Sequence, residues 1–172
     1  MNRIHSLALS LTMLAAFTST SCFDPQHTDE VNAQGGEVNG VGPGPTHRPG
    51  QYCRACHGGS GPGKPEFSIA GTVYATRGNG TPKDKVSVGL TDATGASRTL
   101  TSNEVGNFYI PIDQWSPTFP VSVTLSFPGL DPSKQTQMQT LIGRNGSCAF
   151  CHYGADSEAS HMLPVYLEEA KP

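Results

Sequence analysis

The sequence carries the same group of two cysteines and one histidine twice. It reads "CRACH" at residues 53–57 and "CAFCH" at residues 148–152. Thiolate and imidazole groups bind borderline and soft metals, and paired thiols also form or exchange disulfides. The spacing therefore predicts a metal, cofactor or disulfide function at both places. The six residues are Cys53, Cys56, His57, Cys148, Cys151 and His152.

Each Cys-x-x-Cys-His group resembles the haem-attachment motif of c-type cytochromes. Two thiols three positions apart on one helical turn can bond the two vinyl groups of a haem, while the adjacent imidazole binds the iron. The resemblance implies two covalent haem c groups, with His57 and His152 as the proximal iron ligands. The thioethers would form at Cys53, Cys56, Cys148 and Cys151.

Two other uses of the cysteines stay open. Two Cys-x-x-Cys knuckles can form one four-thiolate structural zinc site, and an exported chain can form two disulfides. Neither requires a histidine after each second cysteine, and with 6 histidines in 172 residues this placement rarely arises by chance. A thioredoxin-like dithiol would need a βαβ pattern, which the sequence lacks. Haem is therefore the favoured interpretation.

The second axial ligand of each haem iron is less well marked by the sequence. His47 and His161 each flank a motif and are our candidates for distal ligands. Met162 competes for the second haem, since a thioether ligand raises the reduction potential relative to a second imidazole.

The first 21 residues have the pattern of a signal peptide. Arg3 precedes an apolar run at residues 6–17, which is too short to span a bilayer, and small residues follow it. A small-residue stretch ending in Cys22 resembles the lipobox of bacterial lipoproteins, although Ser19 stands where leucine is usual. The resemblance implies lipidation of Cys22 and a membrane anchor in the periplasm or outer membrane. Cleavage without lipidation is the alternative.

Residues 22–50 predict a flexible tether, because they hold almost no large apolar side chain and show no period. His27 lies far out in this segment and is the least favoured distal ligand. Residues 51–66 then form the first haem-attachment segment.

Residues 67–169 predict an all-β domain, a seven-strand antiparallel Greek-key sandwich. Apolar residues alternate with polar ones, most clearly in "VSVTLSF", and Phe67, Ile69 and Val73 are expected on one inward face. The second haem-attachment loop, 146–161, lies between the sixth and seventh strands. Successive antiparallel strands alternate in direction, so after six strands the chain returns to the end where the first strand began. Both motifs are therefore expected at the same end of the sandwich. The expected strands are 67–75, 86–90, 98–102, 107–111, 121–127, 138–142 and 162–167.

The run "IAGTVYA…VSVGLTDATGA…TLTSNEVGNFYI" resembles the carboxypeptidase regulatory-like domain. The resemblance covers about residues 67–128 and implies a prealbumin-like β-sandwich. In that family the module has no catalytic residues, so it implies a fold and no reaction.

Charge and motif content exclude some functions. The chain has 11 basic and 14 acidic residues without a basic cluster, which argues against nucleic-acid binding. It shows no catalytic-triad spacing and no site for a small-molecule substrate. We therefore expect a dihaem electron carrier that serves other redox proteins and is not an enzyme. The alternatives are a β-sandwich binding module with a zinc clamp and a dihaem enzyme such as a peroxidase.

Overall fold

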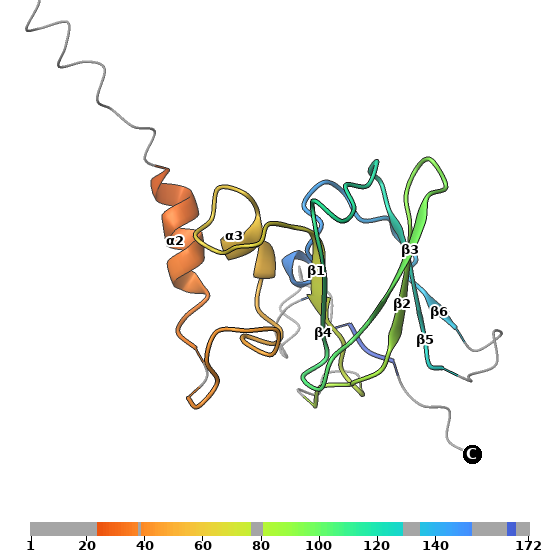
Figure 1. The fold of residues 1–172 in the computed structure, drawn as a ribbon, viewed down its shortest axis with the longest axis horizontal. Helices are drawn as coiled ribbons and strands as arrows, with labels where there is room; N and C mark the ends of the chain where they lie inside the picture. The colour runs from red at the N-terminus through yellow and green to blue at the C-terminus, as the bar shows by residue number, and fades with distance from the viewer. Residues whose placement is uncertain (1–23, 38, 77–80, 129–134, 153–164, 168–172) are drawn as a thin grey trace, which may run out of the picture.

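The computed structural model describes residues 24–37, 39–76, 81–128, 135–152 and 165–167. Over these residues the protein is mostly β, and its two sheets face each other as a sandwich. The helical segments lie together beside the smaller sheet (Figure 1). No helix among the described residues has both the length and the apolar character needed to cross a membrane.

All strand pairs in the two sheets are antiparallel. The smaller sheet contains β1 (Phe67–Thr72) and β4 (Asn107–Pro111). The larger sheet contains, in spatial order, β3 (Ser97–Thr101), β2 (Ser87–Thr91), β5 (Ser122–Ser126) and β6 (Thr136–Gln137).

The core lies between the sheets and follows the predicted alternation. Both sheets contribute aliphatic side chains, and Trp115 and Ile142 join them from connecting segments. Burying each large aliphatic side chain contributes about 1.5–3 kcal/mol, so these alternating positions carry much of the stability. The sheet and loop residues predicted inward and found in the core are Ile69, Val73, Val86, Val88, Leu90, Phe108, Ile110, Val121, Val123 and Leu125.

The end of the chain departs from the seven-strand prediction. The expected sixth strand is reduced to exposed β6 and a single bridge between Ile142 and Val121, since few apolar residues are available there to bury. The expected seventh strand lies mostly outside the described residues. Its described part, 165–167, makes a parallel bridge through Tyr166 to Tyr74 rather than an antiparallel pair.

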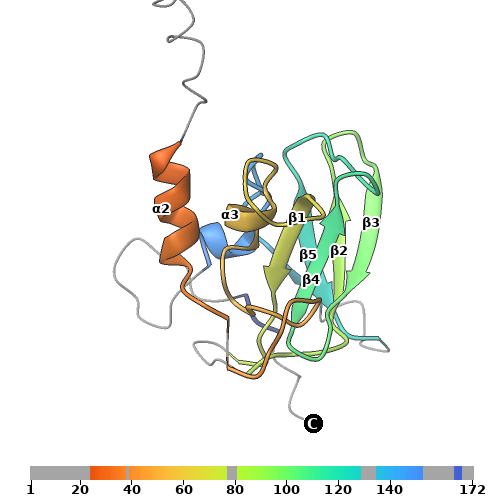
Figure 2. The same cartoon turned by 60° about the vertical axis from the view of Figure 1, so that its left-hand side comes forward.

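Strand β1 is buried along its whole length. One face packs into the core, while helical segments of both cysteine motifs cover the other (Figure 2). The small side chains of Ser68, Ala70 and Thr72 suit this second face because they let a backbone approach closely.

The prediction that Phe67 faces the core with Ile69 is wrong. The pairing of β1 with β4 shifts register between these two residues, so the strand is bulged there. The Phe67 ring instead stacks against His57 and Tyr109, at 4.2 Å and 4.5 Å between ring centres. Phe67 is thereby part of the site and not of the core cluster.

Residues 24–37 and 39–50 differ from the flexible tether that we expected. Helix α2 (Pro25–Ala33) begins at the N-cap Asp24, whose carboxylate accepts a hydrogen bond from the backbone of His27. The following loop returns to the sandwich, where the Gly50 amide donates to Thr72 Oγ1 over 2.8 Å. Polar contacts rather than apolar burial hold this segment. Residues 1–21 and Cys22 lie outside the described residues.

Candidate functional site

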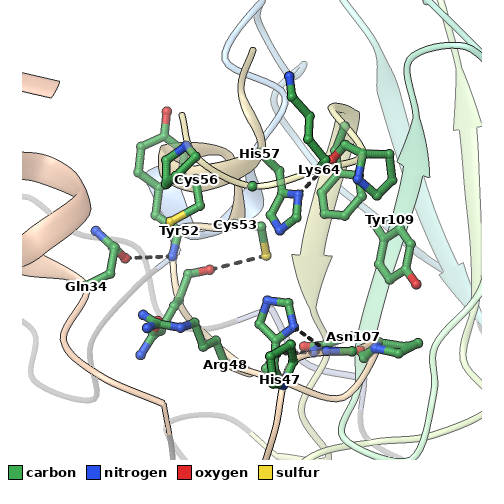
Figure 3. Close-up of a pocket in the computed structure, with 18 of the residues that line it drawn as sticks. Gln34, His47, Arg48, Tyr52, Cys53, Cys56, His57, Lys64, Asn107 and Tyr109 are labelled. Carbon is green, nitrogen blue, oxygen red and sulfur yellow. Dashed lines mark hydrogen bonds between the residues drawn. The ribbon is translucent and has the colours of Figure 1, made fainter. Parts of the chain in front are cut away.

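The first cysteine motif forms the short helix α3 (Cys53–His57) beside a cavity. The cavity has a volume of about 500 Å³, within the range of sites that bind cofactors and small ligands. Cys53, Cys56 and His57 all line it, as does His47 from the preceding loop. Figure 3 shows these side chains converging from the helix and the loop.

The His57 imidazole is held in one orientation. The side chain is 8% exposed, and its Nδ1 lies 2.7 Å from the carbonyl oxygen of Pro65. A carbonyl only accepts, so Nδ1 carries the ring proton and Nε2 keeps its lone pair free for a metal. Gly63 packs against the ring, where an added Cβ would lie 2.8 Å from Nε2.

His47 faces His57 across the cavity (Figure 3). The ring centres are 6.0 Å apart and the ring planes differ by 27°. Two imidazoles that bind one metal from opposite sides, at about 2.0–2.1 Å per bond, have ring centres roughly 6 Å apart. The Gly44 amide donates to Nδ1 of His47 over 3.1 Å, so Nε2 carries the proton of the neutral ring. Metal binding through Nε2 requires that proton to move to Nδ1, and the hydrogen bond from the Gly44 amide is then lost.

Asn107 anchors the His47 loop to the sandwich. Its Nδ2 donates to the carbonyl of His47 over 3.0 Å and to that of Pro45 over 3.3 Å. Its Oδ1 accepts from Thr72 Oγ1 over 2.8 Å, and the residue is only 7% exposed. Sequence reasoning missed this role, although a polar residue at the start of an apolar strand was a possible signal.

The thiols of the first motif lie on the cavity wall. Cys53 Sγ donates to the Gln51 carbonyl over 3.5 Å, and burial raises the pKa of this thiol to about 11. All four described cysteines are free thiols. Cys53 therefore stays protonated at neutral pH, which makes it a poor partner for thiol–disulfide exchange.

The second motif forms the 3₁₀ turn η2 (Cys148–Phe150). Cys148 packs against the core, beside the position where Gly71 leaves room for its sulfur. Burial, together with the nearby Cys53 thiol, raises the pKa of Cys148 to about 12. Cys151 is exposed and His152 is half-buried. The candidate ligands His161 and Met162 lie outside the described residues.

The two motifs lie side by side against β1. Arg54 donates to the carbonyls of Arg144 and Asn145, immediately before the second motif. The Asn145 amide donates to the Tyr52 hydroxyl over 2.6 Å, and the Tyr52 ring lies 5.8 Å from that of Phe150.

The reason for this proximity differs from the strand-parity argument. The residue before the second motif, Ser147, forms a parallel bridge with Ala70 in β1. The second motif therefore lies along β1 rather than at the end of a long sixth strand. Among the described residues, no three His, Cys, Asp or Glu side chains gather into one metal-binding group.

Comparison with protein-family models, with curated proteins and with solved structures finds no match for this chain.

Proposed function

We propose that this protein is an exported dihaem c-type cytochrome that passes electrons between redox partners. The observation that carries the proposal is the pair of imidazoles, His57 and His47, facing each other across a cavity whose wall holds Cys53 and Cys56. Two thiols, a proximal imidazole and a distal imidazole are the donor set of a covalently attached, six-coordinate haem. The sequence resemblance of both motifs to c-type cytochromes supports the same assignment.

Haem, when bound, supplies one-electron redox chemistry. The chain supplies attachment, orientation and shielding. Cys53 and Cys56 provide the thioether sulfurs, and the Pro65 carbonyl holds His57 with its Nε2 free. Phe67 stacks on the proximal imidazole and shields it from water. Two imidazole ligands favour a lower potential than an imidazole with a methionine.

The position of His47 favours electron transfer over a peroxidase. A haem enzyme needs an open coordination position for its substrate, and His47 stands where that position would be at the first haem. Glu37 and Arg48 also line the cavity, but their side chains pair with each other over 2.9 Å. We therefore propose no catalytic residue.

The zinc alternative is less well supported by the geometry. A four-thiolate clamp needs the thiolates of both motifs in one place. The Cys53 and Cys148 thiols lie near each other, but Cys151 is exposed, and no group of three or more such ligands is gathered among the described residues.

The proposal also covers the second motif and the N-terminal segment. Cys148 and Cys151 would hold the second haem, with His152 as its proximal ligand. Cys22 would carry a lipid that anchors the protein in the periplasm or outer membrane, with other redox proteins as partners. The seven-strand Greek-key, prealbumin-like form of the sandwich belongs to the proposal too, supported by the resemblance over residues 67–128.

Expression of the full chain in a bacterial host able to mature c-type cytochromes tests the proposal. We expect red protein whose denatured mass exceeds that of the processed polypeptide by two haems. Replacing Cys53 and Cys56 by alanine should remove one haem, and replacing Cys148 and Cys151 should remove the other. A Cys22→Ser variant is the matched control and should keep both haems. Colourless protein containing one zinc ion would show the proposal to be wrong.

A further inference from the structure

Arg48 directly follows His47 and has a backbone conformation that residues with a Cβ rarely adopt. Its φ is 51°, in the left-handed region. This conformation is unfavourable for any residue other than glycine and persists where surrounding contacts hold it. Figure 3 shows Arg48 beside His47, with its side chain extending away from the imidazole. The loop that carries His47 is therefore held in shape by contacts at Arg48 rather than by its own backbone preference.

The guanidinium group of Arg48 supplies these contacts. Its Nε donates to Glu37 Oε1 over 2.9 Å in an ion pair, and its Nη1 donates to the Gly35 carbonyl over 2.7 Å and to Gln51 Oε1 over 3.0 Å. The planar, always charged guanidinium suits several such bonds at once. One side chain thus joins the loop of His47 to the segment after α2 and to the residues that lead into α3.

Residues 34–37, which follow helix α2, meet both walls of the cavity. Two of them hold Arg48 on the side of His47. On the other side, Gln34 Oε1 accepts a hydrogen bond over 2.9 Å from the amide of Tyr52, the N-cap residue of α3. Segment 34–37 therefore connects the loop of one imidazole to the helix of the other.

Asn107 holds the same loop from the side of the sandwich, through the carbonyl of His47. The hydrogen bond from the Gly44 amide does not hold the ring once Nε2 binds a metal, because Nδ1 then carries the proton. Two anchors remain, Asn107 on one side of the loop and Arg48 on the other. Two anchors restrict the imidazole more than one does, and a metal ligand needs this restriction because it must reach the metal at a set distance.

We propose that Arg48 is a positioning residue for His47, and that segment 34–37 sets the separation of the two imidazoles through it. The inference rests on the proposed function and deepens it, because it identifies what keeps the distal imidazole in place at the first haem. Arg48 itself does not bind the iron. The segment after α2 thereby gains a role that a flexible tether does not have.

Carbon monoxide binding to the matured full chain, reduced with dithionite, tests the proposal. The wild type sets the baseline, and His47→Ala sets the value for a fully open first haem. Arg48→Gly removes the guanidinium but suits the left-handed backbone, so its effect reports the side chain and not backbone strain. We expect Arg48→Gly to bind carbon monoxide above the baseline, at part of the His47→Ala value.

Electron paramagnetic resonance of the oxidised protein gives a second measurement, which a change in overall stability would not move. The g values of a low-spin ferric haem depend on the angle between the planes of its two imidazoles, and the two rings differ by 27° here. Arg48→Gly should shift or broaden the signal of one haem. An unchanged signal together with baseline carbon monoxide binding would contradict the proposal.

Two further substitutions separate the anchor from a general effect on the fold. Glu37→Ala, at an exposed carboxylate, should act in the same direction as Arg48→Gly but more weakly. The double variant should bind no more carbon monoxide than Arg48→Gly alone, because the carboxylate acts through the guanidinium. Arg98→Ala is the matched control: it removes an exposed guanidinium on the larger sheet, which donates to the Ser97 carbonyl, and should behave as the wild type.

Different failures have different meanings. Haem attached at Cys53 and Cys56, with wild-type carbon monoxide binding and spectra in both Arg48→Gly and Glu37→Ala, would overturn the role of Arg48 and leave the cytochrome proposal intact. Peptide mass spectrometry of the wild type that finds no haem at these two cysteines would overturn both.

Discussion

The imidazole rings of His47 and His57 face each other with their centres 6.0 Å apart. One ring belongs to helix α3 and the other to a loop that is fastened to the sandwich by Asn107. The relation therefore depends on the β domain, which holds the loop at a set distance from the helix. If the cavity holds the proposed haem, substitutions on its two sides should change the ligation of the iron in different ways.

Replacing His47 by methionine should raise the midpoint potential of one of the two haems by on the order of 100 mV, because a thioether stabilises reduced iron relative to imidazole. Spectroelectrochemical titration measures the change. Thr46 precedes His47 on the same loop, so Thr46→Ala is the matched control and should leave both midpoint potentials unchanged. Equal potentials in His47→Met and the wild type would mean that His47 is not an axial ligand.

Replacing Asn107 by leucine should loosen the His47 loop without touching the cavity's donor atoms. We expect destabilisation of about 1–3 kcal/mol, the usual effect of leaving buried hydrogen-bond partners unsatisfied. We also expect carbon monoxide to bind part of the first haem in the reduced protein. Urea unfolding and carbon monoxide titration measure the two effects.

Ser102 provides the comparison for Asn107. Its hydroxyl is also buried in the sandwich, where it accepts from the Val86 amide and donates to the Lys83 carbonyl, and neither partner belongs to the His47 loop. Ser102→Ala should lower stability similarly but bind no carbon monoxide. If Asn107→Leu and Ser102→Ala bind carbon monoxide to the same extent, Asn107 acts only through the overall stability of the fold.

Gly63→Ala should displace the proximal imidazole. The added methyl group would lie 2.8 Å from the His57 ring atoms, closer than van der Waals contact allows. We expect a weaker or shifted low-spin spectrum of the first haem. Gly143→Ala is the matched control, since nothing lies within 4 Å of a Cβ there. Identical spectra for the two variants would show that Gly63 does not fix the ring.

The Asp92 carboxylate should stabilise the sandwich at neutral pH, and this contribution to the free energy of unfolding should be lost in acid. The Thr94 hydroxyl, then the Thr118 amide and other backbone amides, donate to its carboxylate and lower its pKa below the ordinary value. A lowered folded-state pKa gives stability that is present above the unfolded pKa of about 3.9 and is lost as pH falls through the folded value.

Urea unfolding of wild type and Asp92→Asn at neutral pH and near pH 3 tests this effect. The variant should be less stable at neutral pH and should lose less stability between the two conditions. Asp113→Asn, at an exposed carboxylate, serves as control and should follow the wild type. Parallel acid losses in wild type and Asp92→Asn would contradict the prediction.

The alternation of apolar and polar residues predicted which strand residues face the core. Alternation in residues 121–127 correctly placed Val121, Val123 and Leu125 in the core. The same rule failed for Phe67, because a bulge in pairing with β4 leaves no trace in the alternation of β1 itself.

Only some of the residues that line the cavity were predicted from the sequence. Cysteine spacing identified the motifs, and proximity in sequence suggested His47. Helix α2 and the loop after it have too little apolar surface to be recognised as ordered, since their order depends on partners such as Asn107 and Tyr52. His27 therefore resembled part of a tether until its helix was seen against the first motif.

The hydrogen bonds from Arg54 to the carbonyls of Arg144 and Asn145 join positions 90 and 91 residues apart. Contacts so distant along the chain can form only once the intervening loop has closed. If the chain is exported from its N-terminus, as proposed, the first pair of thiols emerges before these carbonyls. An attachment enzyme would thus meet those thiols while they are still unenclosed.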